Sequence, residues 1–218
     1  QFHTTVLFML AWPYTGDSVR LMSSYAFADF MEGPPGVEWD SLRDMATPVY
    51  GDGKQSYPER CRRTPDTSPV TAAYDNNTAE PWVCEHRWTG VGAFIRLRKL
   101  FGGYKKAPKP THLWSDEKGH VAFSVGGDAF YAFSRGHNQV TGSGPRGPLS
   151  LEGMRTGLPA GLYCDLAQLD GPLPAAAPPA GWACGGAGGR VSVGKGGRIT
   201  AGTLANGHAL AVHVNYQG

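Results

Sequence analysis

The spacing of apolar residues changes near the middle of the chain, and this change divides the chain into two halves. In the first half, an apolar run over residues 2–12 ends at Pro13 and predicts the last turns of a buried helix. A short β-prone run over 19–27 follows, and a second helical pattern begins at Pro81 and ends at Gly102. A helix followed by a strand is typical of part of an α/β barrel or an open α/β sheet.

The second half shows the alternation that is typical of antiparallel strands. Two pairs of β-prone segments flank glycine-rich turns and predict hairpins: 120–125 with 130–134, and 190–193 with 198–201. Residues 208–216 alternate and predict a terminal strand with its apolar side chains on one face. Because no long helical period follows Gly103, this half is predicted to form an antiparallel β-sandwich.

The segment between residues 28 and 79 is long, irregular and rich in proline and glycine. A connection of this length inside a compact domain is usually a functional loop. If the first half is part of a barrel, the loop leaves the carboxyl end of a strand, where barrel enzymes build their sites. Its acidic residues show no spacing that singles out a catalytic pair.

Composition and charge narrow the possible partners. The chain has 218 residues, of which 31 are glycine and 17 are proline, and 17% are charged. A net charge of +2 gives no electrostatic reason to expect nucleic acid or an anionic membrane as a partner. No apolar run approaches the ~20 residues of a membrane-spanning helix, and residues 6–12 lack the basic flank of a secretory signal.

Four cysteines, Cys61, Cys84, Cys164 and Cys184, lack the CxxC spacing of a zinc site. An even count in a chain rich in glycine and proline indicates two disulfides and an oxidising compartment. Of the three possible pairings, the local one joins Cys61 to Cys84 and Cys164 to Cys184. The alternative is four free thiols in a reducing compartment. Asn76 begins a tripeptide that fits N-glycosylation, a pattern that is common by chance.

Two segments carry a resemblance to a known family. Residues 82–88 read WVCEHRW, and residues 156–165 read TGLPAGLYCD. Together with FMLAWPY at 8–14 and MSSY at 22–25, they stand in the order found in α-amylases of the animal, chloride-dependent type. The chain resembles the back end of such an enzyme over nearly its whole length.

The resemblance implies an α/β part followed by an all-β part. Residues 1–105 would form the last part of a (β/α)8 TIM barrel, in which 8–14 resemble the end of helix seven, 20–27 strand eight and 82–88 the start of helix eight after a long loop. Residues 106–218 would form an antiparallel Greek-key β-sandwich domain. A lone barrel strand leaves both of its edges unpaired, so the first part should be unstable alone, whereas the second part is expected to fold alone.

The resembling family consists of secreted, extracellular retaining hydrolases that cut α-1,4-glucans internally. Its catalytic carboxylates lie on barrel strands that precede the equivalent of Gln1, and its calcium ligands also precede that position. The resemblance therefore implies no catalytic residue and no metal ligand in this chain. By this resemblance, the chain would act on an α-glucan substrate only together with its partner, the N-terminal catalytic barrel portion of the same protein. The alternative is a non-catalytic, amylase-derived structural or carbohydrate-binding component of a larger assembly.

One residue matches a functional position of the family. Arg20 resembles the strand-eight arginine that binds chloride in chloride-dependent amylases. A buried guanidinium needs an anion, and a fixed chloride beside a general acid would raise the pKa of that acid. The alternative is an arginine that pairs with an acidic side chain of the barrel. Trp39 is the best tryptophan candidate for stacking on substrate, because it lies in the strand-eight loop beside acidic residues.

Overall fold

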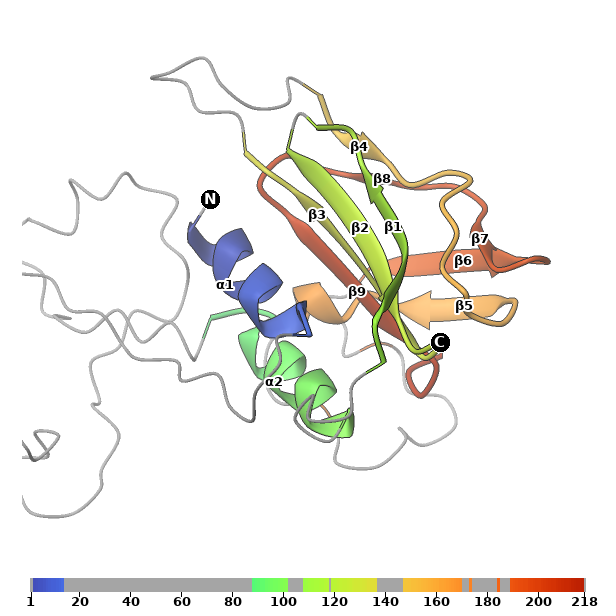
Figure 1. Cartoon of the computed structure of the whole chain (residues 1–218), viewed down its shortest axis with the longest axis horizontal. Coiled ribbons are helices and arrows are strands. Elements are labelled where there is room, and N and C mark those ends of the chain that lie inside the picture. The colour runs from blue at the N-terminus through green and yellow to red at the C-terminus, as the bar shows by residue number, and fades with distance from the viewer. Residues whose placement is uncertain are drawn as a thin grey trace, which may run out of the picture. The chain divides into compact units, whose positions relative to one another are not determined.

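The structure is a computed structural model, and it describes only part of the chain. The described residues are 2–13, 88–101, 108–117, 119–136, 147–169, 173, 184 and 189–217. Residues 1–19 and 89–218 form one compact unit. Within its described part, two α-helices and a short 3-10 helix accompany three antiparallel sheets (Figure 1).

A four-stranded sheet lies at the centre of this unit. Its strands are β1 (Pro110–Ser115), β2 (His120–Val125), β3 (Ala129–Ser134) and β9 (Ala209–His213), in the order β1-β2-β3-β9. Each neighbouring pair is antiparallel. The β2–β3 pair confirms the first predicted hairpin. Its turn contains Gly126 and Gly127, which have φ angles of 73° and 125° that side chains disfavour.

The second layer consists of two smaller sheets. Strands β5 (Gly161–Cys164), β6 (Arg190–Gly194) and β7 (Arg198–Ile199) form one, and β4 (Leu149–Ser150) pairs with β8 (Thr203–Leu204) in the other. The β6–β7 pair confirms the second predicted hairpin. The two layers share a core to which Phe130, Leu210 and Val212 contribute from one side and Tyr163 and Ile199 from the other. This arrangement is that of a β-sandwich.

Helices α1 (Phe2–Ala11) and α2 (Val91–Leu100) lie on the opposite face of the four-stranded sheet (Figure 1). Phe8 makes edge contacts with Phe123 and Phe133, with ring centroids 6.2 and 5.3 Å apart. Phe94 lies 5.7 Å from Tyr131 between ring centroids. Since alternate strand residues point to opposite faces, β2, β3 and β9 are buried on both sides, whereas β1 at the edge of the sheet is largely exposed.

Burial of β9 on both faces goes beyond the prediction for the terminal strand. All five residues of β9 are buried, whereas the sequence pattern identifies one apolar face, to which Leu210 and Val212 contribute. Ala209 and Ala211 supply small side chains on the second face, and His213 packs there against the ring of Phe101. The 3-10 helix η5 (Leu166–Gln168), which packs against β9, and Phe101 after α2 therefore cover a face of β9 that alternation alone leaves exposed.

The two helices match the sequence prediction differently. Helix α1 ends at Ala11, before Pro13, as predicted. Helix α2 begins at Val91 rather than at Pro81, because residues 88–90 form a turn. Gly90 in that turn has a φ angle of 79°, and a Cβ atom there would lie 2.4 Å from the carbonyl oxygen of Ala167. Only glycine fits this close approach, which fixes the start of α2.

Polar contacts hold the helices to each other and to the sheet layer. The buried Arg98 of α2 donates Nη1–H bonds to the carbonyl oxygens of Leu10 and Trp12, each at 3.2 Å. These bonds satisfy carbonyls at the C-terminal end of α1, where a cation also complements the helix dipole. The Thr4 hydroxyl donates to the carbonyl oxygen of Gly207 in the loop before β9. The helices are thus fixed parts of the compact unit.

A disulfide joins Cys164, at the end of β5, to Cys184. This bond confirms the Cys164–Cys184 half of the local pairing. The other half, Cys61 with Cys84, lies outside the described residues, and so do residues 102–107, which contain the predicted domain boundary between 105 and 106. That boundary stays a prediction. None of the described helices has the length and apolar character needed to cross a bilayer.

Replacing both Cys164 and Cys184 by alanine is expected to lower the free energy of unfolding by roughly 3 kcal/mol. The bond closes a loop with a sequence separation of 20, and opening that loop returns chain entropy to the unfolded state. Urea unfolding at constant pH, compared with the unmodified chain, measures the change. An unchanged unfolding midpoint would show that the loop is constrained without the bond.

Candidate functional site

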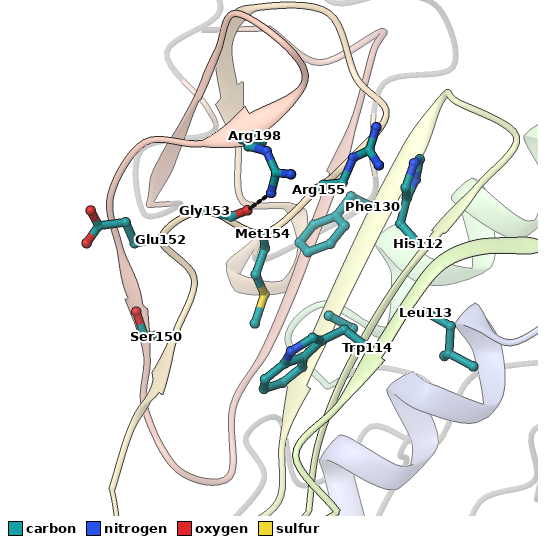
Figure 2. Close-up of a pocket in the computed structure, with 11 residues that line it drawn as sticks. His112, Leu113, Trp114, Phe130, Ser150, Glu152, Gly153, Met154, Arg155 and Arg198 are labelled. Carbon is teal, nitrogen blue, oxygen red and sulfur yellow. Dashed lines mark hydrogen bonds between the residues drawn. The ribbon is translucent and has the colours of Figure 1, made fainter.

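A pocket of about 490 Å3 opens between β1 and the second layer (Figure 2). Three parts of the chain supply its walls: His112–Trp114 of β1, Ser150 of β4 with residues 152–155 after it, and Arg198 of β7. Ala122 of β2 and Phe130 of β3 also line it, and both side chains are buried. Its size falls in the range of small-molecule sites, and its lining combines aromatic, apolar and charged groups.

An irregularity in β1 shapes one wall of the pocket. Thr111 pairs with Ser124 and Trp114 with Ala122, so β1 has one residue more than β2 between these pairs. His112, inside this bulge, has a φ angle of 50°. Bulges bend a strand and re-aim its side chains. Trp114 is 40% exposed and presents its indole ring at the pocket (Figure 2).

Backbone pairing between two segments builds the opposite wall. Arg155 and Arg198 face each other in an antiparallel β-bridge. The neighbouring bonds are Ile199 N–H to the Met154 carbonyl at 3.0 Å and Thr156 N–H to the Gly197 carbonyl at 2.7 Å. Arg198 Nη1 also donates to the carbonyl oxygen of Gly153 at 2.6 Å (Figure 2). These bonds place two guanidinium groups at the same pocket.

The lining of this pocket suits binding rather than hydrolysis. A retaining glycosidase needs two carboxyl groups about 5 Å apart. Glu152 is the one carboxylate among the described residues that line the pocket, and Figure 2 shows it extending away from the others. Across the described residues, no three His, Cys, Asp or Glu side chains are arranged to hold a metal ion.

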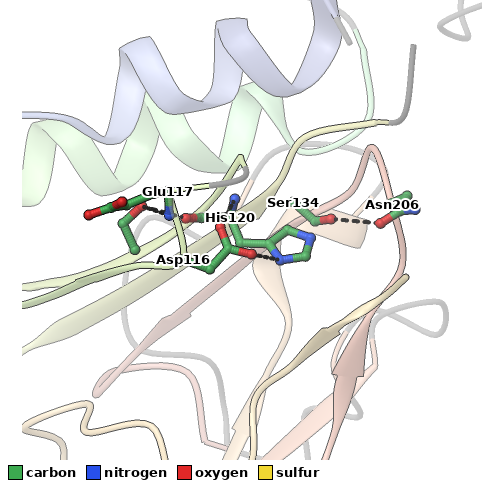
Figure 3. A network of polar contacts seen from close by, with 6 residues as sticks. Asp116, Glu117, His120, Ser134 and Asn206 are labelled. Atoms are coloured by element: carbon green, nitrogen blue, oxygen red, sulfur yellow. Dashed lines mark hydrogen bonds and ion pairs between the residues drawn. The ribbon is translucent and has the colours of Figure 1, made fainter. Parts of the chain in front are cut away.

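A polar network closes the turn between β1 and β2 (Figure 3). His120 Nδ1 lies 2.9 Å from Asp116 Oδ2, and the His120 backbone N–H donates to Asp116 Oδ1 at 3.0 Å. Ser134, the cross-strand neighbour of His120, donates its hydroxyl to Asn206 Oδ1 at 3.3 Å. Asp, His and Ser occur together in hydrolytic triads, but His120 and Ser134 are 5% and 0% exposed. The network therefore holds strands together and does not meet a substrate.

Asp165 is the most strongly perturbed carboxyl group of the described residues. Its Oδ1 accepts bonds from Ala167 N–H at 2.9 Å and Ala211 N–H at 3.3 Å, which link the 3-10 helix η5 (Leu166–Gln168) to β9. Burial raises the pKa of Asp165 to about 7, against these two bonds, which lower it. With 7% of its surface exposed, Asp165 acts on stability rather than on a ligand.

Few of the site residues predicted from the sequence are among the residues that the structure describes. Five candidates lie outside the described residues: Arg20, Trp39, Cys61, Asn76 and Cys84. Chloride binding, substrate stacking and glycosylation therefore stay predictions. The pocket residues were not singled out by the sequence, since they come from three separate segments. One available signal was Trp114, a large aromatic residue in an otherwise polar stretch before the first hairpin.

Comparisons with known proteins place these features in context. No family model matches the chain. The α-amylase of Tenebrio molitor is 31% identical over 216 residues, which cover 98% of this chain and 35% of the relative. Pancreatic α-amylase 2a5 of Mus musculus is 28% identical over 171 residues, which cover 78% of this chain and 27% of the relative. The chain thus spans about a third or less of the curated relatives it matches.

Solved structures give the same result for the fold. The wild-type α-amylase I of Eisenia fetida matches with a TM-score of 0.56 and 24% identity, over 98% of this chain and 35% of that one. The solved structures thus share the fold of this chain, and the sequence matches align it to the C-terminal part of α-amylases.

Proposed function

We propose that this chain is the C-terminal portion of an α-amylase-like hydrolase that cleaves α-1,4-glucosidic bonds within starch or glycogen. The observation that carries the proposal is the 31% identity to the Tenebrio molitor enzyme, which extends over 98% of the chain. The β-sandwich with two covering helices supports it, because α-amylase I of Eisenia fetida matches over the same 98% of the chain. The catalytic carboxylates belong to the portion upstream of this chain.

In this proposal, the chain works as one partner of a larger unit. Its other partner is the N-terminal catalytic barrel portion, and residues 1–105 complete that barrel with strand eight and helix eight. Residues 106–218 form a sandwich with Greek-key connections. Arg20 contributes to a chloride site beside the general acid, whereas calcium is bound upstream. The protein is secreted, and the disulfide at Cys164 supports an oxidising compartment.

A second candidate function has one observation in its favour. The described lining of the pocket with the exposed Trp114 holds no catalytic pair of carboxylates, yet the pocket has the size and lining of a binding site. This fits a non-catalytic, carbohydrate-binding component of a larger assembly. The two candidates differ in whether the upstream portion has catalytic carboxylates.

We expect this chain alone to release no reducing ends from starch, and the chain joined to its natural N-terminal portion to cleave starch internally. The reason is the absence of a carboxylate pair from the described site, because the retaining mechanism needs both groups. The assay uses maltooligosaccharides blocked at both ends, which only an endo-acting enzyme cuts. NMR of the first product measures whether the α configuration is retained.

Two results would count against the hydrolase. The joined polypeptide could bind starch and leave it intact, which would favour the non-catalytic candidate. Alternatively, this chain alone could hydrolyse the blocked substrate, which would place the catalytic groups inside it. The matched control is the joined polypeptide with its upstream nucleophilic carboxylate changed to an amide, which should fold and bind but not cleave.

A further inference from the structure

Two arginines of the pocket occupy positions that are unfavourable without a ligand. Arg155 and Arg198 are direct cross-strand partners in their β-bridge. Side chains at such positions project from the same face with Cβ atoms roughly 5 Å apart, and like charges there destabilise a sheet. Neither guanidinium forms an ion pair with an acidic side chain of the described residues. The like charges are therefore not offset from within the described part of the chain.

The donors of these arginines remain available at the pocket. Arg198 uses Nη1 for the Gly153 carbonyl, but a guanidinium carries five N–H donors in a fixed fork. Arg155 makes no side-chain hydrogen bond to a described residue and is exposed. In Figure 2, its guanidinium lies between Arg198 and His112, while Glu152 points elsewhere. Apart from Glu152, the charged groups among the described lining residues are thus the guanidinium groups of Arg155 and Arg198.

The remainder of the pocket offers a flat apolar surface. Trp114 is 40% exposed, and Met154 lies beside it, partly buried against the core (Figure 2). An indole face beside fixed hydrogen-bond donors accommodates a ring that is apolar on one face and polar at its edge. Guanidinium forks bind phosphate and carboxylate with two parallel hydrogen bonds. One ligand satisfies both halves of the pocket only if it carries a ring and a negative charge.

We propose that this pocket binds a saccharide that carries a negatively charged group. Trp114 packs against the sugar ring, and Arg155 and Arg198 bind the charge. The assignment of a sugar rests on the proposed function, since the relatives act on glucans. The assignment of a negative charge rests on the two arginines alone. Phosphate, sulfate and carboxylate substituents share the chemistry that the arginines recognise.

The test is calorimetric titration of the full chain, which measures binding without hydrolysis. Four probes are compared at 50 mM and 200 mM salt: a neutral maltooligosaccharide, the same sugar carrying a phosphate ester, the same sugar with a terminal carboxylate, and inorganic phosphate. We expect at least one charged sugar to bind about tenfold tighter than the neutral one, and more weakly at high salt. Inorganic phosphate should bind much more weakly than the charged sugar, because it lacks the ring.

Variants separate the pocket from general surface charge. Arg155→Gln should remove the tenfold preference for the charged sugar and leave the neutral sugar unaffected, whereas Trp114→Ala should weaken both sugars. Arg190→Gln is the matched control, since Arg190 is an exposed arginine of β6 outside the pocket lining. Equal binding of neutral and charged sugars, equal effects of Arg155→Gln and Arg190→Gln, or phosphate binding as tight as the charged sugar would each overturn the proposal. Because no step depends on cleavage, failure here leaves the hydrolase proposal untouched.

Discussion

Deleting residues 1–105 is expected to abolish cooperative folding of the remaining chain. The deletion removes α1 and α2, which cover the outer face of the four-stranded sheet. Phe123, Tyr131 and Phe133, which are at most 3% exposed, would then face water. Burying one large apolar side chain contributes roughly 1.5–3 kcal/mol, and a whole domain is stable by only about 5–15 kcal/mol. This revises the sequence-based expectation that the β half folds alone.

A matched variant tests whether the helices cause this loss. It keeps both helices and replaces residues 14–87 by a flexible glycine-serine linker, and we expect it to unfold cooperatively. Far-UV circular dichroism in urea and binding of a hydrophobic dye measure folding and exposed apolar surface in both variants. If residues 106–218 alone unfolded with the same midpoint as the helix-containing variant, the helices would not stabilise the sheet.

The second large effect is an opposite pH response of two variants, Asp165→Asn and His213→Asn. The folded-state pKa of Asp165, about 7, is above its ordinary value of 3.8, because burial disfavours the charged form. Protonation of the Asp165 side chain therefore stabilises the folded state fully below about pH 4, and this stabilisation is lost as the pH rises to about 7. The difference between the two pKa values corresponds to about 4 kcal/mol in the free energy of unfolding. Asparagine keeps an acceptor for Ala167 and Ala211 N–H and needs no proton.

The stability that His213 contributes changes with pH in the opposite direction. Burial lowers its pKa from 6.5 to about 4, although the charge of Asp128 acts against this shift. The contribution of the neutral imidazole is complete above about pH 6.5 and is lost as the pH falls toward 4, by about 3 kcal/mol. Asparagine at this position can still accept the bond that Nδ1 accepts from Asn215 N–H. In the unmodified chain, the two contributions largely offset each other between pH 4 and 6.5.

Urea unfolding at pH 4, 5.5 and 7 distinguishes the two variants. Asp165→Asn should become more stable as the pH rises from 4 to 6.5, and His213→Asn should become less stable over the same range. Glu152→Gln, at an exposed carboxylate, serves as the control and should follow the unmodified chain. If the free energy of unfolding changed with pH in the same direction in both variants, the burial effects assigned to Asp165 and His213 would be contradicted.

Features set by neighbouring residues could be predicted from the sequence. Both hairpins follow from strand alternation around glycine turns, and the end of α1 follows from Pro13. Features that depend on distant packing could not. The late start of α2 comes from the contact of Gly90 with Ala167, far along the chain, and burial of both faces of β9 comes from elements that alternation does not reveal.

The pocket also could not be predicted from the sequence, because its residues are brought together by contacts between distant segments. Trp114, Arg155 and Arg198 lie about forty residues apart from one to the next, and no spacing rule brings them together. The β1 bulge and the bridge between Arg155 and Arg198 do so through backbone pairing. The family resemblance, in contrast, was accessible from short segments, because 82–88 and 156–165 preserve order and residue types without any need for coordinates.

The most direct test of the central claim is the intact mass of the protein purified from its natural source, measured with and without reductant on a sample assayed for starch cleavage. The account predicts that activity follows a species with a mass well above the 23.3 kDa of this chain and that this species contains the present sequence at its C-terminal end. An active species of 23.3 kDa with no accompanying polypeptide would contradict it.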